Sequence, residues 1–322
     1  MAASERGAAH LSAAGGLDLV AGGAGFIGSH VVEALLAAGR RVRVADDLSS
    51  GHARNLEGRK VEFLKGDLAE SSVAREACAG VERVFHLAAR PSVPWSVAHP
   101  EAARRANLET TLALLEAAGP AGVERIVYSS SCAVYGDLPG LPKREDAPVA
   151  PLSPYAEHKL AGEEALAAAA AGGGPGAASL RYFNVYGPRQ DPSSPYSGVV
   201  SLFTQRALRG ERAVIFGDGE QTRDFVFVSD VVRANFLAAA APLKDAARVF
   251  NVARGESVTI LALWAAVQEA AGRAPREAEF APARAGDLLH SRAAVERAAA
   301  ELGFRAGTTL AEGLTAYLAT GN

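Results

Sequence analysis

Tyr155 and Lys159 are the two side chains whose types and spacing most directly suggest catalysis. They lie four residues apart in the segment PYAEHK, at the start of a stretch of helical composition, so both project from one face of a helix. A free tyrosine has a pKa of about 10 and is a poor base at neutral pH, but an adjacent ammonium group favours its phenolate. The pair therefore suits proton transfer, with an ordinary surface pair as the alternative.

A run of small polar residues, YSSSCAVYG at 128–136, follows a predicted strand. Residues at this place lie at the carboxyl edge of a parallel sheet, where such architectures bind ligands. Ser131 could there bridge a substrate hydroxyl and Tyr155, although serines after a strand also serve as plain turn residues. The predicted catalytic group is thus Ser131, Tyr155 and Lys159.

Three glycines, Gly22, Gly25 and Gly28, form a GxxGxxG motif between an apolar run and a helical stretch. Small residues there let backbone N–H groups approach a pyrophosphate at the helix N-terminus, although such glycines can also serve only a tight turn. Asp46 closes the next predicted strand, where a carboxylate can accept both adenosine ribose hydroxyls and repel a 2'-phosphate. The sequence favours NAD over NADP, with a turn-forming Asp46 as the alternative.

These residues need a scaffold, and the sequence alternates strand and helix patterns. Strands are predicted at 17–21, 41–45, 61–64, 83–87, 125–129 and 179–183, with helices between them such as 27–38, 101–118 and 155–171. The alternation predicts an α/β fold with a Rossmann-type, doubly wound parallel sheet. We expect a mobile tail over 1–16, an NAD-binding domain over 17–183, and a smaller C-terminal α/β substrate lobe over 184–322, interleaved with the first domain.

Composition excludes several classes of protein. With 36 acidic and 33 basic residues the net charge is −3, which gives no electrostatic footprint for nucleic acid or an anionic membrane. The sequence predicts no membrane span and no metal site, and His86 and His158 are interpreted as structural. Two cysteines, Cys78 and Cys132, are too few for a disulfide scaffold, so a cytoplasmic setting is expected.

From Leu17 onward the chain resembles the extended short-chain dehydrogenase/reductase superfamily, and within it the nucleotide-sugar 4-epimerases. The motifs that carry the resemblance are GGAGFIGSH at 22–30, GDL at 66–68, HLAA at 86–89, SSSCAVYG at 129–136, SPYAEHK at 153–159, RYFNVYGPRQ at 181–190 and GDGEQTRDFVFVSD at 217–230. The resemblance implies a UDP-sugar substrate, NAD as cofactor, and a homodimer formed through the helices predicted at 101–118 and 155–171.

The resemblance also implies roles for individual residues. Those expected to bind NAD are Gly22, Gly25, Phe26, Ile27, Gly28, Asp46, Asp47, Asp67, Leu68, Leu87, Ala88, Ala89, Asn107, Tyr155, Lys159 and Phe183. Those expected to bind the UDP-sugar are Ser92, Ser130, Ser131, Tyr155, Asn184, Val199, Phe216, Arg223, Arg284, Asp287 and Ser291. Asn184 and Arg223 would hold the diphosphate, which a planar guanidinium also suits on physical grounds.

The implied reaction is epimerisation without net redox change. Tyr155 would take the proton of the sugar 4-hydroxyl while C4 gives a hydride to NAD, and the 4-keto sugar would turn over before the hydride returns. Related 4,6-dehydratases place Asp and Glu after the catalytic hydroxyl, where this chain has Cys132 and Ala133. Neither can supply the extra acid or base, so epimerisation is favoured.

The substrate sugar is less closely defined. Ser92 lies in a segment that resembles the SVPxS loop of UDP-N-acetylglucosamine 4-epimerases, and Ser291 stands where glucose-restricted epimerases carry tyrosine. A small residue there leaves room for an N-acetyl group, with a surface turn as the alternative. A UDP-glucuronate 4-epimerase, another NAD-dependent nucleotide-sugar oxidoreductase and a non-catalytic nucleotide sensor stay as competing hypotheses.

Overall fold

The computed structural model of the chain describes residues 15–190, 198–243, 246–283 and 288–320. Residues 1–14 of the predicted tail lie outside the described residues, as do Arg284 and Asp287 of the predicted substrate site.

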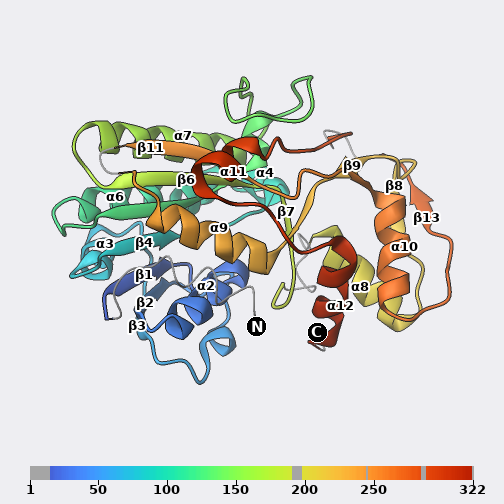
Figure 1. Cartoon of the computed structure of the whole chain (residues 1–322), viewed down its shortest axis with the longest axis horizontal. Helices are drawn as coiled ribbons and strands as arrows, with labels where there is room; N and C mark the ends of the chain where they lie inside the picture. Colours follow the sequence, from blue (N-terminus) through green and yellow to red (C-terminus); the bar gives the residue numbers. More distant parts are fainter. Residues whose placement is uncertain (1–14, 191–197, 244–245, 284–287, 321–322) are drawn as a thin grey trace.

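A seven-stranded sheet lies at the centre of the fold, in the order β11-β6-β5-β4-β1-β2-β3 (Figure 1). Every pairing in it is parallel. The chain runs outward from β1 in one direction and then from β4 in the other, so the topological switch point, where such sheets bind ligands, lies between these two strands. The strands are β1 (Leu17–Ala21), β2 (Arg41–Asp46), β3 (Glu62–Lys65), β4 (Arg83–His86), β5 (Arg125–Ser131), β6 (Gly176–Tyr182) and β11 (Ala247–Val252). The predicted Rossmann-type sheet is confirmed.

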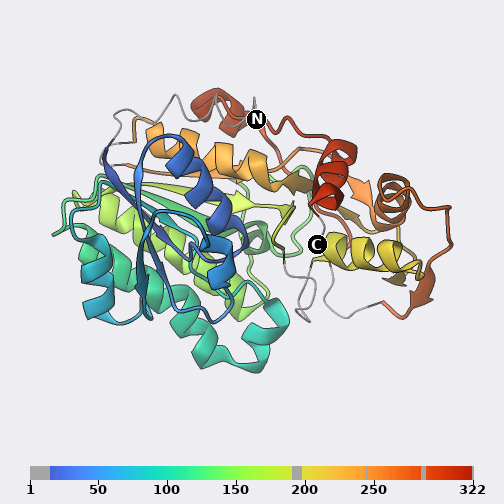
Figure 2. The same ribbon diagram turned by 90° about the horizontal axis from the view of Figure 1, so that it is seen from below.

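Helices cover both faces of this sheet, as Figures 1 and 2 show in two views. One layer contains α2 (Phe26–Ala37), α9 (Val228–Ala240) and α11 (Glu296–Leu302), and the other contains α3 (Ser71–Cys78), α6 (Thr110–Ala118) and α7 (Pro154–Ala171). Because both faces are buried, the strands read as nearly continuous apolar runs, such as LDLVA in β1. The sheet therefore presents its carboxyl edge as the open place for a ligand.

The helix predicted at 101–118 is interrupted. The structure has α4 (Val93–Ala98), α5 (Pro100–Arg104), a π-helical turn over Arg105–Glu109, and then α6. The Arg105 carbonyl accepts the Thr110 N–H across the wider turn and also the Thr110 hydroxyl, at 3.1 Å. The buried Asn107 lies within this turn and accepts the Arg90 N–H, which joins the turn to the segment after β4.

A second, smaller group of elements lies beside the sheet, on the right in Figure 1. Its three two-stranded pairs are β7 (Asn184–Tyr186) with β10 (Phe225–Phe227), β8 (Val214–Phe216) with β13 (Glu279–Ala281), and β9 (Thr222–Arg223) with β12 (Val258–Thr259). Its helices are α8 (Val199–Arg209), α10 (Ile260–Ala270) and α12 (Leu310–Ala319). The rings of Phe203 and Trp264 meet edge to face at 5.4 Å in its core.

The two parts of the fold are not continuous in sequence. Helix α9 and strand β11 follow β10 in sequence but pack into the central sheet layer. This arrangement agrees with interleaved parts, while the division at residues 183 and 184 stays a prediction.

Candidate active site

The glycine loop between β1 and α2 is shaped for a close approach. Gly22 has φ +79°, and an added Cβ there would lie 2.6 Å from the Ala88 nitrogen. A Cβ on Gly28 would lie 2.1 Å from the Gly22 oxygen, so these two glycines are required by chain packing. At Gly25 the same Cβ would meet only the Gly22 oxygen, at 3.3 Å, which leaves the outer side of this residue open.

The beginning of α2 is open in the same place. Gly25 is its N-cap and offers no side-chain acceptor, so the first N–H groups of the helix, at Phe26 and Ile27, have no capping side chain. Unpaired N–H groups at a helix N-terminus bind phosphate oxygens. The loop therefore fits the pyrophosphate of a dinucleotide.

Asp46 ends β2 beside this loop. Its carboxylate accepts the Ala24 N–H at 2.9 Å through Oδ2 and the Leu48 N–H at 2.8 Å through Oδ1. Each oxygen keeps a further lone pair, so the group is fixed in place yet able to accept ribose hydroxyls. Burial raises the pKa of Asp46, and the two N–H donors partly offset this by lowering it. The neighbouring Asp47 instead accepts the Ser49 N–H at 2.8 Å within its own turn.

The predicted walls of the cofactor site also come together. Asn107 accepts the Arg90 N–H at 2.7 Å and so holds the segment after β4, whose Ala88 abuts Gly22. Asp67 accepts from Arg105 at 2.8 Å, next to the buried Leu68. Leu87 and Ala89 flank Ala88 on the same segment, and Phe183 is buried at the end of β6.

Tyr155 is fixed at the first turn of α7. Ser153 caps this helix by accepting the Ala156 N–H at 3.3 Å, and Pro154 follows at a position where proline costs no hydrogen bond. Ser96, wholly buried in α4, accepts the Tyr155 N–H at 3.2 Å. Helix α7, which carries Tyr155, is thus held to α4, the helix that Ser92 caps.

The three predicted catalytic residues lie together at the carboxyl edge of β5. Ser131 accepts the Ala133 N–H at 3.2 Å, as the cap of a 3-10 turn over Cys132–Tyr135, and its hydroxyl acts to lower the pKa of the Tyr155 phenol. Lys159 donates to the Ser129 carbonyl at 2.7 Å. Its Nζ lies 4.8 Å from the centroid of the Tyr128 ring and 5.9 Å from that of Tyr155.

Burial sets the electrostatics of this group. It lowers the pKa of Lys159 to about 7, with Glu163 one turn further along α7 acting in the opposite direction. Burial also raises the pKa of Tyr155 to about 12, and Ser131 partly offsets this by lowering it. A buried ammonium and a buried phenolate each favour the charged form of the other. The negative charge left when Tyr155 loses its proton is therefore balanced by the ammonium of Lys159.

Ser130 differs from its predicted role. Successive strand residues point to opposite faces of a sheet, so Ser130 and Ser131 face different sides. The Ser130 hydroxyl donates to the buried Glu163. Glu163 also accepts two hydrogen bonds from Arg181, at 2.9 and 2.6 Å. Direct contact of Ser130 with a substrate stays a prediction that this geometry does not favour.

The predicted diphosphate and sugar residues lie on the second part of the chain. Arg223 ends β9, and Ser291 donates its N–H to the carbonyl of the preceding Thr222 at 3.1 Å, so Arg223 and Ser291 are brought close. Ser291 is only 8% exposed, which contradicts the surface-turn alternative. Burial raises the pKa of the Cys132 thiol to about 12, against which the charge of Arg223 acts, so Cys132 is a neutral thiol.

The remaining predicted substrate residues are spread around this edge. Asn184 begins β7, Val199 begins α8, and Phe216 ends β8, all half-buried. Ser92 is buried and caps α4 by accepting the Trp95 N–H at 3.1 Å. Contact between these side chains and one substrate stays a prediction.

Sequence reasoning missed four residues that organise the site: Ser96, Glu163, Arg181 and Asp224. Glu163 could have been found, because it continues the spacing of four that joins Tyr155 and Lys159. Arg181 and Asp224 stood inside motifs that were recognised only for their neighbours. Ser96 stood inside the SVPxS segment, which was recognised only for Ser92, and its contact with Tyr155 spans 59 residues.

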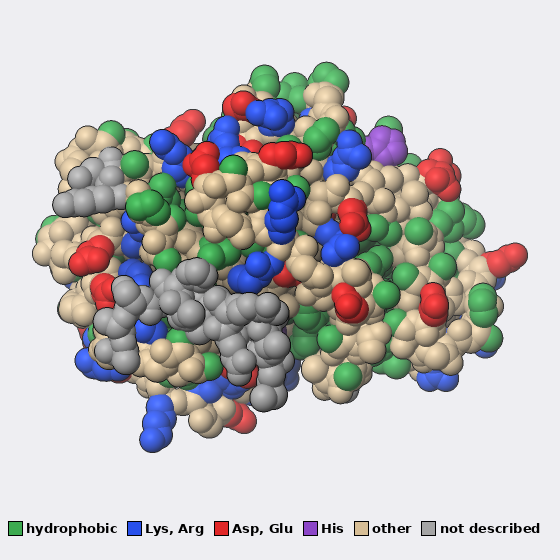
Figure 3. Space-filling model, viewed as in Figure 1, with side chains coloured by type: hydrophobic (Ala, Val, Ile, Leu, Met, Phe, Trp, Pro, Cys, Tyr) green, Lys and Arg blue, Asp and Glu red, His purple; other side chains and the backbone are tan. Residues whose placement is uncertain are grey.

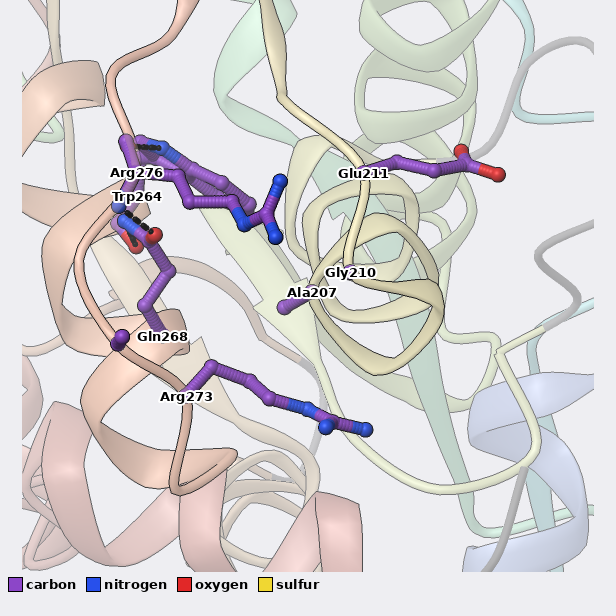
Figure 4. A pocket seen from close by; sticks show the side chains of 8 residues that line it. Ala207, Gly210, Glu211, Trp264, Gln268, Arg273 and Arg276 are labelled. Atoms are coloured by element: carbon purple, nitrogen blue, oxygen red, sulfur yellow. Dashed lines mark hydrogen bonds between the residues drawn. The ribbon is translucent and has the colours of Figure 1, made fainter.

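A separate hollow of about 200 Å³ lies between α8 and α10 (Figure 4). Trp264, Gln268, Arg273 and Arg276 line one side of it and Ala207 and Gly210 the other, so it includes no predicted site residue. On the face in Figure 3, acidic and basic side chains are interspersed. Among the described residues, no helix is long and apolar enough to span a membrane, and no group of three or more His, Cys, Asp or Glu could hold a metal ion.

Comparisons with known proteins show which enzymes this chain resembles. The chain is 44% identical over 302 residues to a UDP-glucose 4-epimerase of Mycolicibacterium smegmatis, covering 92% of this chain and 95% of the relative. It resembles the structure of a Thermus thermophilus UDP-glucose 4-epimerase complex with NAD, with 39% identity, a TM-score of 0.84, and 94% and 98% of the two chains covered. It also resembles a UDP-N-acetylglucosamine 4-epimerase of Methanobrevibacter ruminantium in complex with UDP-N-acetylmuramic acid, with 35% identity, a TM-score of 0.89, and 96% and 100% covered.

The family model for the NAD dependent epimerase/dehydratase family matches residues 19–253, which include the glycine loop, Asp46, the Ser131, Tyr155 and Lys159 group, and Arg223. This chain therefore belongs to the NAD dependent epimerase/dehydratase family.

Proposed function

We propose that this chain is an NAD-dependent UDP-hexose 4-epimerase, acting on UDP-N-acetylglucosamine and UDP-N-acetylgalactosamine, on UDP-glucose and UDP-galactose, or on both pairs. The observation that carries the proposal is the group of the half-buried Ser131 with the buried Tyr155 and Lys159, together with Cys132 and Ala133 where a dehydratase would need acids. The similarity to two kinds of UDP-hexose 4-epimerase supports it.

The cofactor fits residues of this chain. Gly22 and Gly28 let the loop and α2 pack closely, Gly25 leaves its outer side open to the pyrophosphate, and Asp46 offers two fixed acceptors to the adenosine ribose. NAD, when bound, supplies reversible hydride transfer. Without a 2'-phosphate it escapes repulsion by the Asp46 carboxylate.

The chain's own residues handle the proton. Ser131 orients the sugar 4-hydroxyl, and Tyr155 takes its proton as the C4 hydride leaves. Lys159 stabilises the phenolate because its charge is buried and its nearest acceptor is only a main-chain carbonyl. After the 4-keto sugar has turned, Tyr155 returns the proton to the 4-oxygen while C4 regains its hydride on the opposite face, which inverts the configuration at C4.

Binding and chemistry are divided between the two parts of the chain. Arg223 on β9 would hold the diphosphate, while Tyr155 on α7 would carry out the proton transfer. An anchored diphosphate lets the sugar rotate without leaving the site. The small, buried Ser291 beside Thr222 supports acceptance of an N-acetyl group.

The assembly is proposed to be a homodimer, in a cytoplasmic setting. Helices α6 and α7 pack together on one outer layer of the molecule, and Leu112 on α6 is 40% exposed. Both cysteines are free, which suits a reducing compartment. Light scattering coupled to size exclusion would give twice the chain mass for a dimer, and the single chain mass would refute it.

Proton NMR tests the function directly. Purified protein is incubated with UDP-N-acetylglucosamine and, separately, with UDP-glucose, each with and without added NAD. We expect the C4 epimer of at least one, and loss of at least about a thousandfold in kcat on replacing Tyr155 with Phe. Inversion of neither sugar, or an unchanged rate in Tyr155→Phe, would refute the proposal. UDP-glucuronate is then the next substrate to try.

A further inference from the structure

Asp224 is a wholly buried carboxylate with main-chain partners. Its Oδ1 accepts the Arg254 N–H at 3.0 Å, and its Oδ2 accepts the N–H groups of Gly255 at 3.0 Å and Ala293 at 3.1 Å. These donors come from two segments, the loop after β11 and the stretch before α11. One carboxylate therefore joins three parts of the chain that are distant in sequence.

Two of the parts that Asp224 joins contain residues proposed to bind the substrate. Arg223 directly precedes Asp224, and the main-chain carbonyl of Asp224 accepts the Asn184 N–H at 3.0 Å. Ala293, which donates to the carboxylate, lies two residues after Ser291. The carboxylate thus holds the segment containing Ser291 against the strand of Arg223, and the main-chain carbonyl of the same residue holds Asn184.

Only a carboxylate suits this environment. It is acceptor-only, with about four lone-pair sites on two oxygens, and both of its oxygens here receive N–H donors. An asparagine would turn an NH₂ group toward one set of those donors and lose its hydrogen bonds. The loss would fall on the loop after β11 and the stretch before α11, not on Tyr155 or Lys159.

We propose that Asp224 is a positioning residue for nucleotide-sugar binding, which acts by holding Arg223, Asn184 and the segment containing Ser291 in one arrangement. The inference rests on the proposed function, because it deepens the role of the same site. It predicts a loss of affinity for the nucleoside diphosphate with little effect on the chemical step.

The chain offers a matched control in Asp230. This residue is also buried in the same region, and it accepts the N–H groups of Gly307 at 2.9 Å and Thr308 at 3.0 Å. Those donors precede α12 and adjoin none of the residues proposed to bind substrate. Asp230→Asn therefore removes a comparable buried acceptor without touching the proposed arrangement.

The test compares Asp224→Asn with Asp230→Asn in the NAD-loaded protein. Calorimetric titration with UDP, KM and kcat for the UDP-hexose, and Tm are measured for both. We expect both variants to lower Tm, and only Asp224→Asn to weaken UDP binding and raise KM, by about tenfold or more, with kcat within about threefold. Unchanged UDP affinity in Asp224→Asn, or an equal loss in Asp230→Asn, would overturn the inference.

Hydrogen exchange of the unaltered protein keeps the inference testable if Asp224→Asn does not fold. Saturating UDP is expected to slow exchange in peptides containing 254–255 and 293, and to leave those containing 307–308 unchanged. Equal slowing in all of them, or in none, would contradict it. If the unaltered protein binds no UDP, the proposed function fails as well; if it binds UDP and inverts C4 but these outcomes are absent, only the role of Asp224 fails.

Discussion

Lys159→Met is expected to abolish catalysis and at the same time make the folded chain more stable at pH 7. Lys159 is 1% exposed, and burial lowers its pKa from 10.5 to about 7. Between these two values the unfolded chain binds a proton that the folded chain does not, so stability rises with pH across this window. At about 1.4 kcal/mol per unit, the buried lysine costs about 4 kcal/mol at pH 7.

Methionine removes that cost but also the hydrogen bond from Nζ to the Ser129 carbonyl, which contributes about 1.5 kcal/mol. The net gain is about 2 kcal/mol at pH 7, or a rise in Tm of roughly 4 °C. Because the wild-type chain recovers stability as the pH rises toward 10.5, the advantage of the variant should vanish above about pH 9.

The assay is denaturant unfolding from pH 7 to 10 on protein freed of nucleotide, since bound cofactor would stabilise the two proteins unequally. Lys60→Met, at an exposed position, is the control and should show no pH-dependent difference from the wild type. A Lys159→Met variant that is less stable at pH 7, or a difference that is flat with pH, would refute the account of the buried ammonium.

Three further predictions concern other parts of the site. Ser291→Tyr should lower kcat/KM for UDP-N-acetylglucosamine by about tenfold or more while that for UDP-glucose changes little, and equal losses for both would show that Ser291 does not line the sugar site. Glu163→Gln should destabilise the fold by about 3 kcal/mol in thermal unfolding, because it leaves Arg181 buried without its anionic partner. Adding Arg181→Met should recover part of that loss, and no recovery would contradict the ion-pair explanation. Asp46→Asn should weaken NAD binding by about tenfold with NADP binding improved, and an unchanged ratio of the two affinities would leave Asp46 as a turn former.

Much of the fold was predictable because its signals are local. The GxxGxxG spacing, the apolar strands and the carboxylate at the end of β2 each depend on residues close in sequence, and the structure has them where the sequence placed them. The π-helical turn over Arg105–Glu109 was not predictable in this way, because residues 101–118 have helical composition throughout.

Contacts across the sequence limited the prediction of the site. Ser130 was assigned to the substrate by its position in a motif, but strand alternation turns its hydroxyl to Glu163, 33 residues away. Asp224 draws its donors from residues 30 to 69 positions further on, so no local spacing identifies it. The burial that shifts the pKa values of Tyr155 and Lys159 likewise arises only once the sheet and α7 are packed.

The most direct test of the central claim uses UDP-glucose or UDP-N-acetylglucosamine carrying deuterium at C4. The account predicts conversion to the C4 epimer with deuterium retained at C4 and no net change in redox state, because the hydride removed from one face returns to the other. Absence of inversion, or inversion with the deuterium lost to solvent, would contradict it.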